Sequence, residues 1–435
     1  MASPKNAVLA AGTTRLHGRD RALTQISAAL APSTPPTVIA VTGAPGVGRT
    51  PVLDAATAAV TVTGDRRVVV VRGRAELAAV PLGALAPAIA EFTSAPTDAM
   101  VSIDETDAVS GSSAALLVAL HREAAAHGLI VVADDAHLLD PSSLCVLEQL
   151  ADSAATLLLS CVSVPGMPAA ASRLAARARH LVELAPLSVP EAHSVVNDIL
   201  GPSAGPTAAE EMHRLAAGST RTLVALAEAA IGADDLRDPG APWRTSWPHL
   251  SAEVVASLPA DPLAADDLVG DLLTLLAVAG ELPVEQAGTS GASERATALA
   301  EQQGFVTTRS ADGRIWVSLA HPLFAPVVLT RVSELSRVNF CAAGADMLDG
   351  YPDHRVRRTL LQLSARQPVD ARRLLDLAHG ELAAQRYTTA ITLGEHAVSG
   401  AGDHPLLRAS GEYVQAQAHS LIGQLESAGE RFAAA

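Results

Sequence analysis

The stretch TVIAVTGAPGVGRTP, residues 37–51, joins a short apolar run to a glycine-rich turn. The apolar run, Thr37–Thr42, is rich in valine and isoleucine, which predicts a strand buried on both faces. The turn has the spacing of a phosphate-binding loop, G-x-x-x-x-G-K-[ST], except that Arg49 stands where the pattern has lysine. A strand, this loop and a following helix together predict an α/β fold that binds a phosphorylated ligand.

The loop predicts contacts to the phosphates of ATP or ADP. Its glycines allow backbone N–H groups to turn inward toward phosphate oxygens, at the N-terminus of the next helix. A hydroxyl after the basic residue suits Mg²⁺, and Thr50 supplies it. A chance glycine-rich turn between a strand and a helix is the alternative. We predict nucleotide contacts from Gly43, Gly46, Val47, Gly48, Arg49 and Thr50.

A second motif argues against chance. The apolar run LIVVADD, Leu129–Asp135, ends in two carboxylates. A carboxylate at the tip of a neighbouring strand is placed to reach Mg²⁺, and the next one can polarise the attacking water. We therefore predict Asp134 as a metal ligand beside Thr50, and Asp135 as the catalytic base. The alternative is that Asp134 and Asp135 are two surface acids at the end of a strand, without a role in catalysis.

Composition limits the class of protein. The 435 residues carry a formal charge of −15, which opposes non-specific binding to a phosphate backbone. Of the 31 lysines and arginines only Lys5 is a lysine, so an arginine in the loop is an understandable substitution. Three scattered cysteines, no signal peptide and no membrane-spanning segment predict a soluble cytoplasmic protein.

The chain reads as five segments. Residues 1–14 form a flexible N-terminus, and residues 15–186 form a nucleotide-binding core. The core begins with a helix, Leu16–Leu30, and four or five short apolar runs then alternate with helical segments. This alternation predicts a parallel sheet with helices on both faces. The predicted strands are Thr37–Thr42, Arg67–Arg72, Leu129–Asp135, Thr156–Val162 and His180–Leu184.

Helices dominate after the core. Residues 187–240 predict a helical lid, whose first helix opens with a capping box of Ser188 and Glu191. Residues 241–335 predict a winged helix, because helices precede a hairpin, FVTTR and RIWVSLA, around the turn Ser310–Gly313.

Residues 336–435 contain a repeat. Tyr387-x-x-Ala390 followed by Ala397 recurs 38 residues later as Leu425-x-x-Ala428 followed by Ala435. Small residues at this spacing are typical of tetratricopeptide-like helix pairs. Generic alanine-rich helices are the alternative. Because the second copy ends within a helix, we expect the repeats to be truncated and the natural protein to continue.

The motifs LHGRDRAL, GAPGVGRT, VVADDAHLLDPSSL, LAPLSVPEA and AHPLF, in this order, resemble the large ATP-binding transcriptional regulators of the LuxR type. These are signal-transduction ATPases of the STAND class, akin to AAA ATPases. The resemblance covers about residues 15–435. It implies a P-loop core, a helical lid, a winged helix and a repeat sensor. The family's DNA-binding helix-turn-helix is absent from this chain, so DNA binding would need a longer one.

The resemblance also implies roles for single residues. Gly18 and Arg19 match a Gly-Arg motif that packs beside the adenine. His321 in AHPLF matches a histidine that points at the ADP β-phosphate, with a buried structural histidine as the alternative. Asp140 matches a structural aspartate. Ser160 lies where such ATPases sense the γ-phosphate, or is a strand-end hydroxyl without a role. Three arginines could approach phosphates or belong to a solvated helical face, namely Arg173, Arg177 and Arg179.

Three departures weaken the expected activity. Arg49 replaces a compact ammonium with a wide guanidinium, and the two are not interchangeable at a crowded site. Pro51 lacks an N–H that such loops direct at the α-phosphate. Gly218-Ser219-Thr220 stands where the family has Gly-Asn-Pro, which removes a proline that contacts the base. We expect nucleotide binding to survive and ATP hydrolysis to be slow or lost.

The leading hypothesis is an ATP/ADP-gated switch with Mg²⁺ as cofactor. A small-molecule or protein inducer would bind the helical repeats, and nucleotide-dependent self-association is expected. A nucleotide-independent scaffold acting through the repeats is the first alternative. A metabolic P-loop kinase is the second, although the order of lid, winged helix and repeats argues against it.

Overall fold

The computed structural model describes residues 16–63, 66–93, 105–162, 167–201, 206–232, 250–284, 293–311 and 313–435. The predicted flexible N-terminus, residues 1–14, lies outside these ranges. The chain divides into two compact units, Met1–Pro259 and Ala260–Ala435. In the described ranges, none of the helices combines the length and apolar character needed to cross a lipid bilayer.

The first unit contains a sheet of five parallel strands in the order β2-β3-β4-β1-β5. All five predicted strands are confirmed, with ends that differ by at most one residue. Three of them are buried along almost their whole length, which explains why they appear in the sequence as unbroken apolar runs. The bounds are β1 Val38–Gly43, β2 Arg67–Arg72, β3 Leu129–Asp134, β4 Ala155–Val162 and β5 His180–Leu184.

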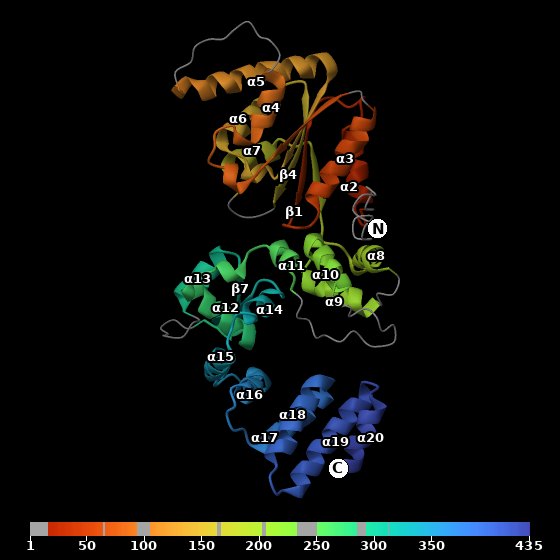
Figure 1. Cartoon of the computed structure of the whole chain (residues 1–435), viewed down its shortest axis with the longest axis vertical. Helices are drawn as coiled ribbons and strands as arrows, with labels where there is room; N and C mark the ends of the chain where they lie inside the picture. Colours follow the sequence, from red (N-terminus) through yellow and green to blue (C-terminus); the bar gives the residue numbers. More distant parts are fainter. Residues whose placement is uncertain are drawn as a thin grey trace, which may run out of the picture. The chain divides into compact units, whose positions relative to one another are not determined.

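Helices cover both faces of this sheet, as predicted (Figure 1). Successive side chains of a strand point to opposite faces. Leu157 and Leu159 of β4 therefore join one core cluster, and Leu158 joins the other. The first cluster is closed by α4 Ala86–Thr93, α5 Glu105–His127, α6 Pro141–Leu150 and α7 Ala169–Ala176. The second is closed by α2 Asp20–Ala29 and α3 Arg49–Thr63.

Four helices complete the first unit, and the capping box at the start of the first is confirmed. The backbone N–H and the hydroxyl of Ser188 both donate to Oε2 of Glu191, each at 2.7 Å. Short 3-10 turns occur at Ala75–Leu77, Gly83–Leu85 and Ala136–Leu138. The four helices are α8 Val189–Leu200, α9 Pro206–Ala216, α10 Thr220–Gly232 and α11 Ala252–Ser257.

The second unit begins with an antiparallel sheet of order β6-β8-β7 among helices. The predicted hairpin is present, but its strands extend into the predicted turn, because Ser310 pairs with Ile315 and Ala311 with Arg314. Asp312 of that turn lies outside the described residues. The elements are α12 Asp267–Ala279, β6 Leu282–Pro283, α13 Glu294–Gln302, β7 Val306–Ala311, β8 Arg314–Leu319, α14 Phe324–Leu329, α15 Glu334–Met347 and α16 Arg355–Ser364, with 3-10 turns at Pro262–Ala264 and Pro352–His354.

Two helix pairs end the second unit and repeat each other after 38 residues, the offset found in the sequence. The pairs are α17 Ala371–Ala383 with α18 Tyr387–Gly400, and α19 Pro405–Leu421 with α20 Leu425–Ala434 (Figure 1). Each pair turns through one left-handed residue, Gln385 in the first and Gly423 in the second. The hydrogen bond from Arg386 N–H to Glu381 O recurs from Gln424 N–H to His419 O, each at 2.9 Å.

The predicted packing role of small residues also appears in the structure. Ala390 and Ala397 of α18 and Ala428 of α20 are buried, whereas Ala435 is exposed. A β-carbon on Gly411 of α19 would lie 2.6 Å from the side chain of Val398 on α18. The close approach of α18 and α19 therefore depends on glycine at this position.

Candidate functional site

The candidate site lies at one edge of the parallel sheet, where the carboxyl ends of three strands meet. β4 pairs with β1 on one side and with β3 on the other. The phosphate-binding loop follows β1, the two aspartates end β3, and Ser160 lies on β4 between them, in register with Val41. The strand order therefore brings together residues that are far apart in the sequence, at the edge where open α/β sheets bind ligands.

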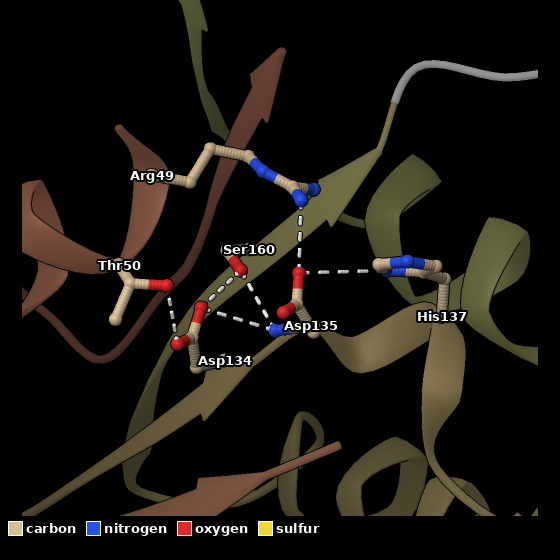
Figure 2. A network of polar contacts seen from close by, with 6 residues as sticks. All are labelled: Arg49, Thr50, Asp134, Asp135, His137 and Ser160. Carbon is tan, nitrogen blue, oxygen red and sulfur yellow. Dashed lines mark hydrogen bonds and ion pairs between the residues drawn. The ribbon is translucent and has the colours of Figure 1, made fainter. Parts of the chain in front are cut away.

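Thr50 and Asp134 contact each other directly (Figure 2). The hydroxyl of Thr50 donates to Oδ2 of Asp134 at 2.8 Å. Oδ1 of the same carboxylate accepts the hydroxyl of Ser160 at 2.6 Å. Both side chains that were predicted to bind Mg²⁺ thus lie together, and a serine that the sequence left ambiguous fixes the orientation of the carboxylate. The backbone N–H of Asp135 donates to Ser160 Oγ at 2.8 Å.

Arg49 and Asp135 form an ion pair beside the first contact. Nη2 of Arg49 lies 2.9 Å from Oδ1 of Asp135, and only 9% of the arginine is exposed. Nδ1 of His137 lies 4.0 Å from the same oxygen and approaches it from another direction (Figure 2). Asp135 has φ 50° and ψ 50°, a left-handed conformation that is unusual for a residue other than glycine. The predicted base is therefore held by Arg49, with His137 close to the same oxygen.

Burial and charge shift the titration of this cluster. Burial raises the pKa of Asp135, although the neighbouring Arg49 opposes that shift, and the charge on Asp134 adds to it. Burial lowers the pKa of His137, against the opposing attraction of Asp135. A carboxyl with a raised pKa beside an arginine, at the end of a buried strand, is a typical environment for a general base.

The loop itself is held by the helices that follow the sheet. Gly46 has φ +75°, and its carbonyl accepts the N–H of Arg221 at 3.0 Å. The carbonyl of Val47 accepts the hydroxyl of Thr220 at 3.1 Å, while its side chain is buried in the core. A β-carbon on Gly46 would lie 2.2 Å from Ser219 Oγ. The start of α10 therefore packs on the loop, where the resemblance placed a lid.

Arg19 joins the loop to the segment after β5. Its guanidinium donates to the carbonyl of Val47 at 2.8 Å and to that of Ala185 at 2.9 Å. Burial lowers the pKa of Arg19, and Glu191 opposes this. A β-carbon on Gly18, which has φ +69°, would lie 2.5 Å from the carboxyl of Glu191, so this position requires glycine. A groove of about 420 Å³ lies beside these residues, lined also by α2 and β5.

Other candidates lie away from this cluster. Asp140 is 1% exposed and caps α6 by accepting the N–H of Ser143 at 2.9 Å; it also accepts the N–H of the distant Leu82 at 2.9 Å, so its role is structural. Arg173 contacts Glu148 at 3.0 Å and Arg177 pairs with Asp152, so both lie on the solvated surface of α6 and α7. The described contacts of Arg179 are those of its backbone N–H, which donates to Val38 O.

His321 belongs to the second unit, where it is 5% exposed. Its Nδ1 accepts the N–H of Leu323 at 3.2 Å, and its ring centroid lies 5.5 Å from that of Phe324. These contacts match the buried, hydrogen-bonded alternative, and a contact of His321 with nucleotide stays a prediction.

Two sets of residues near the site are not predicted by the sequence. His137 follows Asp135 by two residues, in the turn Ala136–Leu138, and this short spacing was the available signal. The contacts of Thr220 and Arg221 with the loop had no local signal, because they depend on how α10 packs. From the sequence, Gly218-Ser219-Thr220 is only a departure from the Gly-Asn-Pro pattern of the family, and nothing in it indicates contact with the loop.

Comparisons with known proteins cover part of the chain. Residues 15–164 match the family described as the AAA ATPase domain. No curated protein matches the chain. Among solved structures it is similar to the Orc1 protein of Aeropyrum pernix in complex with DNA, at 17% identity over 73% of this chain and 94% of that chain, with a TM-score of 0.42.

Two further structures are similar at the same level. Cdc6p of Pyrobaculum aerophilum has 15% identity over 75% of this chain and 97% of its own, with a TM-score of 0.42. A Walker-type ATPase of Pyrococcus abyssi has 12% identity over 72% of this chain and 96% of its own, with a TM-score of 0.42. The part of this chain that carries the candidate site is thus similar in sequence to AAA ATPase domains.

Proposed function

We propose that this chain is the ATP- and ADP-binding switch module of a regulator of the LuxR type, with slow ATP hydrolysis. The observation that carries the proposal is the paired arrangement of Thr50 with Asp134 and of Arg49 with Asp135 at the end of a parallel sheet. The match of residues 15–164 to AAA ATPase domains supports the nucleotide as ligand.

The donor set fits Mg²⁺. A hydroxyl and a carboxylate oxygen 2.8 Å apart are hard oxygen ligands, and Mg²⁺ typically takes one or two such groups together with phosphate oxygens and water. Thr50 and Asp134 would hold the ion, which supplies charge neutralisation at the phosphates when it is bound. The phosphates would lie along the loop, where a β-carbon on Gly48 would meet no atom within 4 Å.

Asp135 serves as the base for hydrolysis. It accepts a proton from the water whose oxygen bonds to the γ-phosphorus, while the bond from that phosphorus to the bridging oxygen breaks and ADP leaves with the electron pair. The ion pair with Arg49 restrains this carboxylate, and Pro51 offers no N–H to the α-phosphate. Slow turnover suits a switch, because hydrolysis there resets a state rather than making a product.

The helical repeats are the proposed place for an inducer, and we propose that the preceding helices and hairpin act as a winged helix. A groove of about 540 Å³ lies between α17 and α19. It combines an apolar floor, including Leu375 and Leu407, with the polar side chains of Arg372, His379 and His404. Such a mixture is typical of ligand sites. Regulation of transcription would act through a DNA-binding helix-turn-helix domain of the kind that the resemblance to the LuxR type implies.

A nucleotide-independent scaffold is the second candidate, and the internal pairing of all four site residues favours it. A thermal-unfolding titration with ADP·Mg²⁺ and ATP·Mg²⁺ separates the two. A ligand that binds the folded state raises the Tm with concentration, by an amount that follows RT ln(1 + [L]/Kd). No shift at millimolar nucleotide would contradict the switch. Nucleotide with a chelator is the control, since removal of Mg²⁺ is expected to reduce the shift.

A further inference from the structure

Only one arm of the Arg49 guanidinium is engaged. Nη2 donates to Asp135 at 2.9 Å, whereas Nη1 is buried and has no hydrogen-bond partner among the described residues. Arg49 as a whole is 9% exposed. A buried donor without an acceptor is costly, so such a group points to an acceptor that comes from outside the chain.

The geometry of arginine separates the two arms. A guanidinium is planar, and its donors form a rigid fork, so Nη1 and Nη2 can hold two different acceptors at once. A lysine ammonium instead carries all its donors on one nitrogen. Arg49 is the first residue of α3, where the helix N-terminus favours an anion. A phosphate oxygen of the nucleotide is the acceptor that this position suits.

We propose that Arg49 binds a nucleotide phosphate through Nη1 while Nη2 keeps its ion pair with Asp135, so that Arg49 restrains the base during the bound state. This inference rests on the proposed function and adds the regulation of its site. Arg49 thus acts as a positioning residue for Asp135 and slows hydrolysis.

The residues around Asp135 favour an ion pair with Arg49 that persists when nucleotide binds. Its N–H is fixed by Ser160 Oγ at 2.8 Å, and its backbone is left-handed. His137 lies near the same oxygen that Arg49 binds, with Nδ1 4.0 Å from Oδ1. Of the two neighbours, only Arg49 hydrogen-bonds this carboxylate, and the fixed backbone of Asp135 keeps Oδ1 within its reach. The competing arrangement is a latch, in which the arriving phosphate takes Arg49 away from Asp135 and releases the base.

A double-mutant cycle on the full chain separates the two arrangements. The variants are Arg49→Met, Asp135→Asn and the pair of both, and the readout is Tm without and with saturating ADP·Mg²⁺. We expect a non-additive Tm change on the order of 2–4 °C in the free protein, and the same value with nucleotide. Coupling that disappears with nucleotide, or that is absent in the free protein, overturns the inference.

The cycle also distinguishes this inference from the proposed function. If nucleotide does not raise the Tm of the native protein at all, both fail. If it raises the Tm but the coupling disappears, only the inference fails. The ion pair of Arg173 with Glu148, also within the first unit, is the matched control, and its coupling should be the same with and without nucleotide.

Hydrolysis gives a second, independent readout. Arg49→Lys keeps the charge at the phosphate but removes the fork, so the single-turnover rate at saturating ATP should rise about 10-fold, which is less than the full contribution of a general base. Arg173→Lys should leave the rate unchanged, and Asp135→Asn should abolish it in either background. An unchanged or slower rate in nucleotide-saturated Arg49→Lys overturns the inference.

Discussion

The hydroxyl of Ser160 links the two aspartates, since it donates to Asp134 at 2.6 Å and accepts the N–H of Asp135 at 2.8 Å. The serine is fully buried on β4, between the strands that carry the loop and the acids. It therefore sets the orientation of the proposed Mg²⁺ ligand, Asp134.

Ser160→Ala should weaken the use of Mg²⁺. Removing a group that orients a metal ligand typically costs 10- to 100-fold in metal affinity, so we expect the Mg²⁺ concentration for half-maximal nucleotide stabilisation to rise about 10-fold. Ser143→Ala is the matched control, because it removes an equally buried serine that donates to Asp140 at 2.5 Å. If both variants lower the Tm and neither changes the Mg²⁺ concentration for half-maximal stabilisation, Ser160 does not orient a metal ligand.

Pro51→Ala should tighten nucleotide binding. The substitution restores an N–H in the first turn of α3, and one hydrogen bond to a charged group corresponds to about 10-fold in Kd. The measurement is Kd for ADP·Mg²⁺ from thermal shifts. Pro141→Ala, in the first turn of α6, replaces a proline away from the loop and should leave Kd unchanged. An unaltered Kd in Pro51→Ala would show that the proline does not weaken the site.

Gly46→Ala should be more destabilising than Gly48→Ala. Both glycines have positive φ, +75° and +103°, so alanine is strained at either position. Only at Gly46 does the new β-carbon clash, at 2.2 Å from Ser219 Oγ, and such overpacking typically costs about 1–3 kcal/mol more. Denaturant unfolding of the nucleotide-free protein measures the difference. Equal losses would mean that α10 does not pack tightly on the loop.

Acid should destabilise the first unit through His137. Its pKa is lowered by burial, so below about pH 6.5 the unfolded chain binds a proton that the folded chain resists. The free energy of unfolding therefore falls as the pH falls through that value, until the folded pKa is reached. His137→Gln should flatten this part of the profile. The same change at the exposed His121 is the control, and two identical profiles would refute the assignment.

The strands could be predicted from the sequence because a strand buried on both faces appears as a continuous run of apolar residues. TVIAVT and LIVVAD are apolar except at their ends, and both form interior strands of the sheet. The pairing of Thr50 with Asp134 was also predictable, because parallel strands end at the same edge.

The ion pair of Arg49 with Asp135 was not predictable in this way. It depends on β4 separating the two strands and on the left-handed backbone of Asp135, neither of which has a local signal. The contacts of α10 with the loop and the longer hairpin strands likewise depend on tertiary packing, which single-residue preferences do not record.

The matching turns at Gln385 and Gly423 affect which changes of length the sequence can tolerate during evolution. The two pairs turn through equivalent positions, each closed by the same hydrogen bond at 2.9 Å, so a whole pair is the unit whose gain or loss would leave these turns unchanged. Descendants of this sequence are therefore expected to tolerate changes of length here in steps of one whole repeat, and to resist shorter insertions within a helix.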